Sequence, residues 1–159
     1  MTVEPVTTVI LVRHADRDKP APGTPQNPDP PLNAKGKARA KTLAQMLSTA
    51  VVQAVYTSPF QRTAQTAEPF IAAHPALPVV SKGTAADLNK HIMEKNAGKV
   101  VLVVGHSNTV PELIKLLDGP VLPEINDCEF DNLFVLVRYS AAKVAVMKFK
   151  YGEPTAAPC

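Results

Sequence analysis

Two continuous apolar runs, each followed directly by ionisable or polar residues, constrain the fold of this chain more than any other feature. The run "VILV" at 9–12 leads into "RHADR", and the run "VVLVV" at 100–104 leads into "GHSNT". Apolar runs that are rich in β-branched residues and lack polar alternation are typical of strands covered on both faces. We therefore expect two central strands of a sheet whose carboxyl ends carry charged and polar groups.

The rest of the chain alternates between strand-like and helix-like segments. Helices are expected from about residue 33 and at 60–73, 85–96 and 108–119; strands are expected at 9–12, 51–58, 77–82 and 99–107, with two more within 132–150. Pro69 should end or kink the second helix, because proline lacks the N–H that continues a helix. This order predicts an α/β fold, a three-layer α/β/α domain with a mostly parallel sheet and an antiparallel C-terminal edge hairpin.

The length of 159 residues favours a single domain spanning 1–159. Six of the sixteen prolines lie in "DKPAPGTPQNPDPPL", which predicts an irregular loop over 19–32. Because this loop follows a charged strand end, it is expected to form a rim or partial lid. The last residues, 152–159, are expected to form a flexible tail.

Composition narrows the partners without identifying a function. A net charge of +3, with its Lys and Arg residues scattered along the chain, gives no indication of nucleic-acid binding. No stretch approaches the roughly 20 apolar residues that cross a bilayer, so no membrane contact is expected. The N-terminus lacks a signal-peptide pattern. A cytoplasmic location is the default, although an exported form with its signal peptide removed would have the same sequence. The oligomeric state is left open.

Basic and imidazole side chains gather at the predicted carboxyl edge of the sheet. Arg13 and His14 end the first strand, Arg62 lies in the first turn of the helix after the second strand, and His106 follows the strand at 99–104. Ligands of open α/β sheets bind at this edge. Two guanidinium groups beside a helix N-terminus form an anion site that suits phosphate. A histidine there could either hydrogen-bond the phosphate or attack phosphorus as a nucleophile.

Three motifs that carry these residues, "LVRHADR", "TSPFQRTAQTA" and "VVGHSNT", resemble the histidine phosphatase superfamily, which has the phosphoglycerate mutase-like fold. The resemblance covers residues 9 to about 110, with the motifs in family order. It implies that His14 is the nucleophile that accepts the phosphoryl group. It also implies a phosphate pocket formed by Arg13, Arg62 and His106. Ser107 and Asn108 would add further contacts to the phosphate.

Two departures from the family pattern matter for the chemistry. Ala15 stands where the family usually has Gly, and the extended insertion that carries a catalytic Glu in larger members is absent, as in the small phosphohistidine phosphatases. A leaving group of high pKa still needs a proton donor. Asp16, beside the nucleophile, is the first candidate for this acid; Asp87 and the acidic stretch "EINDCEFD" are alternatives.

The sequence therefore predicts a metal-independent phosphatase, without cofactor, that hydrolyses a phosphomonoester or phosphoramidate through a phosphohistidine on His14. The substrate is a phosphorylated small molecule or a phosphohistidine protein. A metal hydrolase using His14, His106 and Asp16 is disfavoured because two adjacent arginines repel a cation. A serine hydrolase acting through Ser107 fails because no histidine follows it. A non-catalytic module that binds a phosphorylated ligand and a phosphoglycerate mutase-type phosphotransferase remain as alternatives.

Overall fold

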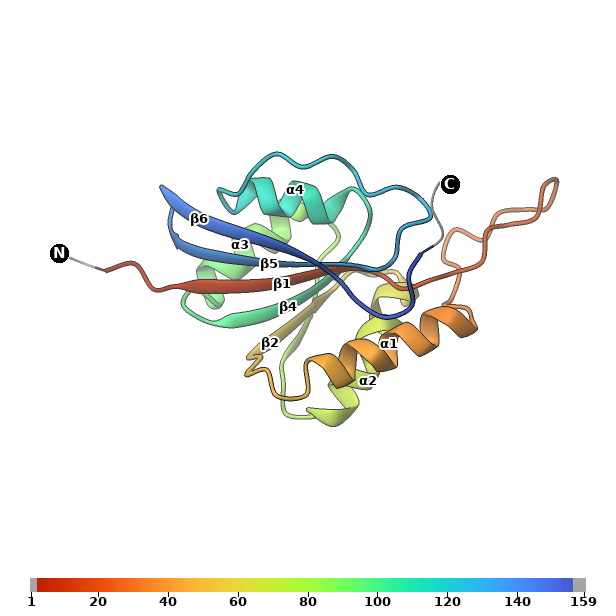
Figure 1. Ribbon diagram of the computed structural model, residues 1–159, viewed down its shortest axis with the longest axis horizontal. Helices are drawn as coiled ribbons and strands as arrows, with labels where there is room; N and C mark the ends of the chain where they lie inside the picture. Colours follow the sequence, from red (N-terminus) through yellow and green to blue (C-terminus); the bar gives the residue numbers. More distant parts are fainter. Residues whose placement is uncertain (1–2, 156–159) are drawn as a thin grey trace.

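The computed structural model describes residues 3–155; residues 1–2 and 156–159 lie outside the described part. Strands and helices alternate along this part and end in a hairpin, as the sequence predicts (Figure 1). In chain order the elements are β1 (Thr7–Arg13), α1 (Ala34–Met46), β2 (Ala54–Thr57), α2 (Gln61–Ala73), β3 (Val79–Ser81), α3 (Ala85–Lys95), β4 (Val100–Gly105), α4 (Thr109–Leu116), β5 (Asn132–Ser140) and β6 (Lys143–Lys150).

The strands form one six-stranded sheet in the order β3-β2-β4-β1-β5-β6. The pairs β3–β2, β2–β4 and β4–β1 are parallel, whereas β1–β5 and β5–β6 are antiparallel. The predicted mostly parallel sheet with an antiparallel C-terminal edge hairpin is therefore confirmed. The apolar runs at 9–12 and 100–104 lie in β1 and β4, which are neighbours in the middle of the sheet.

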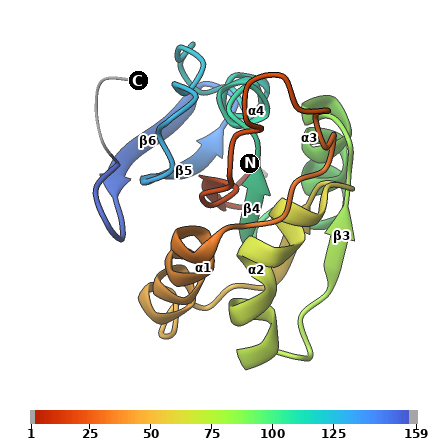
Figure 2. The ribbon, with the colours of Figure 1, turned by 90° about the vertical axis from the view of Figure 1, so that its right-hand side faces the viewer.

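Helices cover both faces of the sheet, with α1 and α2 on one face and α3 and α4 on the other (Figures 1 and 2). Strand β1 feeds both layers, because successive side chains of a strand point to opposite faces. Val9 and Leu11 are fully buried in the core cluster with residues of α3 and α4. Ile10 and Val12 lie in the cluster with residues of α1 and α2. Burial on both faces explains why this strand lacks polar alternation.

Helix α2 covers nearly all of the predicted range 60–73. It does not end at Pro69 but continues to Ala73, with Pro69 inside it. The residue after the proline, Phe70, is fully buried in the core, so packing keeps the last turn in place. The predicted cap of α1 is confirmed, because the Asn33 side chain accepts a hydrogen bond from Gly36 N.

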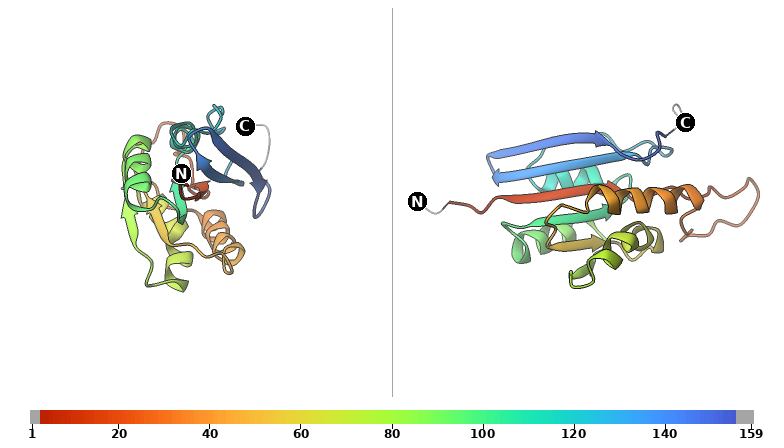
Figure 3. Two further views of the ribbon diagram at one scale, coloured as in Figure 1. Left: turned by 90° about the vertical axis from the view of Figure 1, so that its left-hand side faces the viewer. Right: turned by 60° about the horizontal axis from the view of Figure 1, so that its bottom comes forward.

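The proline-rich segment 19–32 contains neither helix nor strand and extends beyond the carboxyl end of β1 (Figure 3). Of the C-terminal segment 152–159, residues 156–159 lie outside the described part. The described portion is hydrogen-bonded to the domain: Arg39 donates to the carbonyl of Glu153, and Thr155 N donates to Asp131. Within residues 3–155, no helix has the length and hydropathy needed to cross a bilayer.

Candidate active site

The carboxyl ends of β1, β4 and β2 bring the predicted site residues together, at the edge that faces the viewer in Figure 2. Arg13, the last residue of β1, is paired in register with Gly105, the last residue of β4. His14 N donates a hydrogen bond to Gly105 O at 2.8 Å, which extends this pairing by one residue. His106 follows directly, so the two histidine rings come close, with their centroids 5.4 Å apart.

The His14 ring is buried, with only 2% of the residue exposed, and has a fixed orientation. Its Nδ1 lies 2.9 Å from the carbonyl oxygen of Ala15. A carbonyl only accepts hydrogen bonds, so Nδ1 carries the proton and Nε2 keeps the lone pair. Ala15 is itself held by α2, because its N–H donates to Thr66 Oγ1 at 2.9 Å. The fold therefore presents His14 with Nε2 as its basic nitrogen.

Helix α1 approaches the loop after His14 closely enough to exclude any side chain at one position. A Cβ added at Gly36 would lie 2.1 Å from the carbonyl oxygen of Asp16. The same carbonyl accepts a hydrogen bond from Asn33 N at 3.1 Å. The start of α1 thus clamps the backbone two residues beyond the candidate nucleophile.

The Arg13 guanidinium is anchored to the loop that precedes β5. Its Nη1 donates to the carbonyl oxygens of Asn126 and Asp127, each at 3.0 Å, and of Glu129, at 2.9 Å. Its Cζ also lies 4.2 Å from the centroid of the Phe130 ring. With Nη1 committed to three carbonyls, Nε has no hydrogen-bond partner among the described residues, and Nη2 lies 3.5 Å from Asp127 Oδ1.

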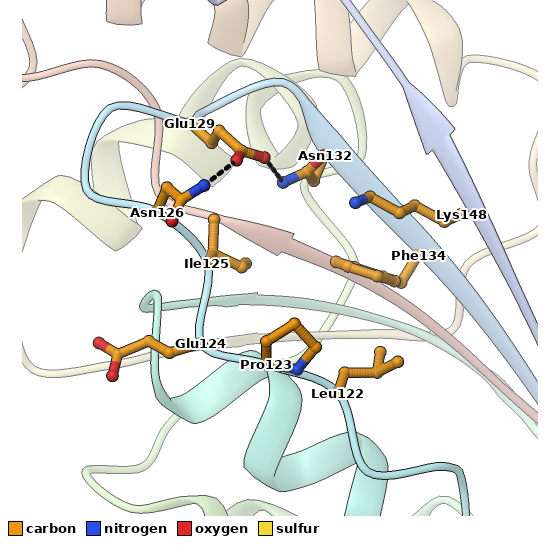
Figure 4. A pocket seen from close by; sticks show the side chains of 9 residues that line it. All are labelled: Leu122, Pro123, Glu124, Ile125, Asn126, Glu129, Asn132, Phe134 and Lys148. Atoms are coloured by element: carbon orange, nitrogen blue, oxygen red, sulfur yellow. Dashed lines mark hydrogen bonds between the residues drawn. The ribbon is translucent and has the colours of Figure 1, made fainter. Parts of the chain in front are cut away.

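The loop that holds Arg13 is braced by one carboxylate. Glu129 accepts hydrogen bonds from Asn126 Nδ2 at 2.6 Å and from Asn132 Nδ2 at 2.9 Å (Figure 4). These bonds hold the pKa of Glu129 below its usual value. The residues drawn in Figure 4 line a separate cavity of about 190 Å³.

His106 is hydrogen-bonded on both ring nitrogens. Its Nδ1 lies 3.4 Å from Nη2 of Arg62, and its Nε2 lies 2.8 Å from Ser58 Oγ. A guanidinium has no acceptor, so Nδ1 must accept, and the ring proton lies on Nε2 and is donated to Ser58. Arg62 also lies over the ring of Phe60, with Cζ 4.4 Å from its centroid.

The folded chain lowers the pKa of both histidines, so both rings are neutral at neutral pH. Burial is the main cause that lowers the pKa of His14 from 6.5 to about 3; its hydrogen bond to Ala15 acts in the opposite direction, and the charges of Arg13 and Arg62 lower the pKa further. Burial likewise lowers the pKa of His106 to about 4, assisted by Arg62 and Arg13. An anion bound to Arg13 and Arg62 would weaken the effect of their charges on the pKa of both histidines.

These side chains surround an open cavity of about 300 Å³. The predicted residues on its wall are Arg13, His14, Arg62, His106, Ser107 and Asn108. Ser107 Oγ also donates to Glu124 at 3.2 Å, and Thr109 Oγ1 accepts from His106 N at 2.8 Å. The N-terminal turn of α4 therefore forms one side of the cavity.

Asp16 does not line this cavity. Its carboxylate oxygen Oδ2 accepts from Nε of the buried Arg39 at 2.6 Å. This contact commits the Asp16 carboxylate to Arg39, which does not suit its predicted role as proton donor to a leaving group. Asp87, an alternative acid, lies in the first turn of α3 and is also absent from the cavity wall.

Four wall residues were not singled out in the sequence: Arg17, Phe60, Gly83 and Thr109. The fifth, Asp127, comes from the acidic stretch that the sequence offers as an alternative source of the acid. Arg17 lies within the motif "LVRHADR", four residues after Arg13, so its place in the motif could have indicated that it lies near the cavity. Asp127 belongs to the acidic stretch "EINDCEFD", but no spacing connects that stretch with the strand ends. Within residues 3–155, no group of three or more His, Cys, Asp or Glu is arranged to hold a metal ion.

The model of the histidine phosphatase superfamily (branch 1) matches residues 9–88 of the chain. This range covers half of the chain and includes β1, α2 and the motifs that carry Arg13, His14 and Arg62. The chain therefore belongs to the histidine phosphatase superfamily. A search of curated proteins finds no match.

Solved structures of similar fold cover nearly the whole chain. One is the protein histidine phosphatase SixA complexed with tungstate, with 19% identity, 90% of this chain and 96% of that chain covered, and a TM-score of 0.68. A candidate phosphohistidine phosphatase SixA from Agrobacterium tumefaciens has 20% identity, 92% and 98% coverage and a TM-score of 0.64. Mycobacterial glucosyl-3-phosphoglycerate phosphatase has 13% identity, 92% and 98% coverage and a TM-score of 0.66.

These similarities confirm the predicted phosphoglycerate mutase-like fold, in the small version that lacks the large insertion. Between α2 and β4 the chain contains only β3 and α3, so the extended insertion of larger members is absent. At identities of 20% or less, the solved structures support the fold alone. Family membership and the cavity between the strand ends together support a phosphatase.

Proposed function

We propose that this protein is a metal-independent phosphatase that hydrolyses its substrate through a phosphohistidine on His14. The observation that carries the proposal is the hydrogen bond from His14 Nδ1 to Ala15 O at 2.9 Å. It leaves the lone pair on Nε2, in a buried ring that is neutral because its pKa is lowered to about 3. A neutral, oriented imidazole beside two guanidinium groups has the properties of a phosphorus nucleophile.

In the proposed mechanism, Arg13 and Arg62 bind the oxygens of the phosphoryl group. Nε2 of His14 forms a bond to phosphorus while the bond to the leaving group breaks. Water then attacks the phosphohistidine, the P–N bond breaks, and its electron pair returns to Nε2. The guanidinium donors act mainly by stabilising charge on the phosphoryl oxygens, which is the main requirement of phosphoryl transfer.

The carboxylates near the site restrict the leaving group. Asp16 is bound to Arg39 at 2.6 Å, and Asp127 is bound to Lys19 at 2.9 Å. Neither carboxylate is free to hold a proton for the leaving group. Aryl phosphates and phosphoramidates, such as phosphohistidine in a protein, need such an acid least. Small phosphorylated compounds with good leaving groups fit the same requirement.

The first test is release of phosphate from 4-nitrophenyl phosphate and from a phosphohistidine peptide, each with a metal chelator present. Wild type is compared with His14→Ala and with His74→Ala, a control at the end of α2. We expect chelator-resistant turnover that is lost by at least a thousandfold in His14→Ala and kept in His74→Ala. Equal turnover by wild type and His14→Ala would refute the mechanism.

Arg62 offers a second test of the phosphate pocket. Arg62→Ala should raise KM and lower kcat together, because the guanidinium contacts the phosphoryl group before and during transfer. Arg62→Lys keeps the charge but loses the planar fork, so it should recover only part of the activity. Full activity of Arg62→Ala would exclude this side chain from the pocket.

The second candidate function is a module that binds a phosphorylated ligand without turnover. The commitment of both Asp16 and Asp127 to basic partners favours it, since neither of these two carboxyl groups is then positioned as an acid. Binding of phosphate by the wild type, with no turnover of either substrate, would select this alternative.

A further inference from the structure

A second cavity, of about 410 Å³, opens beside the candidate active site. Its outer wall is built by the proline-rich loop, through Pro20, Pro28 and Pro30. The two cavities share three wall residues: Arg17, Arg62 and Asp127. A phosphoryl group bound at His14 therefore has this second cavity as its neighbour, and a leaving group can enter it.

The second cavity is fixed in place by contacts between the loop and α2. The carboxylate of Asp29 accepts from the backbone N–H of Gln61 at 3.0 Å and 3.2 Å, at the first residue of α2. Further along, Leu32 N donates to Gln65 Oε1 at 2.8 Å. Together with the restricted backbone of its prolines, these bonds preform the wall before any ligand binds.

Arg17 brings an unpaired charge to this cavity. Its Nε is buried and has no hydrogen-bond partner, and its Nη1 makes only a 3.4 Å contact to Asp18 O. Among residues 3–155, it forms no ion pair within 4.0 Å. Its charge lies close enough to lower the pKa of Arg62, after the larger effect of burial. Guanidinium donors in this state suit an anionic ligand.

The second basic side chain of this wall is Lys19. Its Nζ lies 2.9 Å from Asp127 Oδ2, in an exposed pair. Exposed ion pairs contribute little free energy, so an incoming anion can replace Asp127 at low cost. Arg17 and Lys19 are hereafter called the outer basic pair.

Asp127 is the single carboxylate on either cavity wall among the described residues. A hydrogen bond from Lys19 is the first of the causes that hold its pKa below the usual value. It is therefore ionised at neutral pH and cannot protonate a leaving group. A leaving group that departs without a proton must itself be stable as an anion.

We propose that the preferred substrate is a phosphoanhydride, whose terminal phosphoryl group binds at His14 while its second phosphate binds the outer basic pair. This inference rests on the proposed function and specifies its substrate class. A second phosphate meets both conditions: it provides the negative charge that Arg17 and Lys19 can bind, and it leaves as a stable anion.

The reaction balances without a protein acid. His14 Nε2 forms a bond to the terminal phosphorus, and the bond from that phosphorus to the bridging oxygen breaks. The bond electrons go to the bridging oxygen, which departs as part of a phosphate anion beside Arg17. Water then attacks the phosphohistidine and releases a second phosphate, the P–N electron pair returns to His14, and the proton of water passes to solvent.

The experiment compares inorganic pyrophosphate, the smallest phosphoanhydride, with phenyl phosphate and 4-nitrophenyl phosphate. For the wild type we expect kcat/KM for pyrophosphate to exceed that for phenyl phosphate by at least a hundredfold. Arg17→Gln and Lys19→Gln should each lower the ratio of pyrophosphate to 4-nitrophenyl phosphate activity at least tenfold. The matched control, Lys90→Gln on α3, removes an equal charge from an exposed side chain that lines neither cavity and should leave this ratio unchanged.

Two results would overturn the inference while leaving the proposed function intact. One is His14-dependent turnover of 4-nitrophenyl phosphate with pyrophosphate no better than phenyl phosphate. The other is an equal loss of activity on both substrates in Arg17→Gln, which would place Arg17 at the transferred phosphoryl group instead. Absence of His14-dependent turnover on all three substrates would overturn the phosphatase itself.

Discussion

The guanidinium of Arg39 donates to the carboxylate of Asp16 at 2.6 Å, and both side chains are buried. Arg39 also donates to the backbone carbonyls of Tyr151 and Glu153, at 2.9 Å and 2.8 Å. Asp16 follows the candidate nucleophile by two residues. This pair therefore connects the loop after β1 to the end of the described chain, and we assign Asp16 a positioning role.

Replacing Asp16 tests this role. Asp16→Asn leaves the charge of Arg39 buried without its partner and should lower the free energy of unfolding by about 3 kcal/mol, the usual cost of breaking a buried ion pair. Denaturant unfolding provides the measurement. Glu94→Gln, an exposed change on α3, should alter stability by no more than about 0.5 kcal/mol.

The same variant separates positioning from acid catalysis. A lost acid slows phenyl phosphate far more than 4-nitrophenyl phosphate, because only the poorer leaving group needs the proton. A positioning residue lowers both rates by a similar factor. We expect the ratio of the two rates to stay within threefold of wild type in Asp16→Asn; a drop of a hundredfold would restore Asp16 as the acid.

The sheet and the convergence of the strand ends could be predicted because they depend on local signals. Continuous apolar runs identify β1 and β4. Arg13 is the last residue of β1, and His106 directly follows β4. Once alternation predicts a parallel sheet, the carboxyl ends must meet at one edge. Nothing more than strand order is then needed to bring two histidines and two arginines together.

Side-chain partners beyond these motifs could not be predicted, because they depend on distant segments. Asp16 faces Arg39 because α1 approaches its backbone at Gly36, a contact that no spacing in the sequence indicates. Asp127 reaches the cavity because Arg13 binds the carbonyls of its loop, more than a hundred residues away. The continuation of α2 past Pro69 has a similar cause, since tertiary packing of Phe70 overrides the local helix-breaking tendency.

The lowered histidine pKa predicts how stability depends on pH. The pKa of His14 is about 3 in the folded chain, against 6.5 for an ordinary histidine, so the unfolded chain binds more protons at mildly acidic pH. Stability from this group is therefore complete above about pH 6.5 and is lost as the pH falls toward the folded value.

Unfolding measured between pH 7 and pH 4.5 checks this prediction. The free energy of unfolding of the wild type should fall by at most about 2.5 kcal/mol through His14, since each pH unit is worth about 1.4 kcal/mol. His14→Ala should show a correspondingly smaller decline over the same range. Identical declines in the two proteins would mean that His14 is not held neutral by the fold.

Binding of an anion should protonate His106. Its Nδ1 accepts from Arg62 in the free protein, and neighbouring positive charges contribute to its low pKa of about 4. A charge at about 4 Å contributes about 4 kcal/mol at an effective dielectric constant of 20, which is about three pKa units. A bound dianion should therefore bring the pKa of His106 toward neutrality and make Nδ1 a donor.

Calorimetric titration with sulfate measures this proton uptake, because sulfate stays a dianion over the pH range used. Titrations at pH 6 in two buffers with different heats of ionisation should give an uptake approaching one proton per sulfate. His106→Asn should abolish the uptake, whereas His14→Ala should retain it. Sulfate binding by the wild type without proton uptake would contradict this account of the His106 pKa.

Asp127 provides the last prediction, because it contacts basic groups on both sides of the site. Its carboxylate lies 2.9 Å from Lys19 Nζ and 3.5 Å from Arg13 Nη2. As a counter-ion it competes with the substrate for these groups, so Asp127→Asn should lower KM for anionic substrates about threefold to tenfold. Because Arg13 stays bound to backbone carbonyls, kcat should change little.

An acid role for Asp127 predicts the opposite pattern. Asp127→Asn would then keep KM and lower kcat, most strongly for phenyl phosphate, whose leaving group is the poorest. Steady-state kinetics on phenyl and 4-nitrophenyl phosphate distinguish the two roles. The salt dependence gives a further readout. Without the competing carboxylate, the basic groups attract the anionic substrate more strongly, and because salt screens this attraction, KM should rise more steeply with ionic strength.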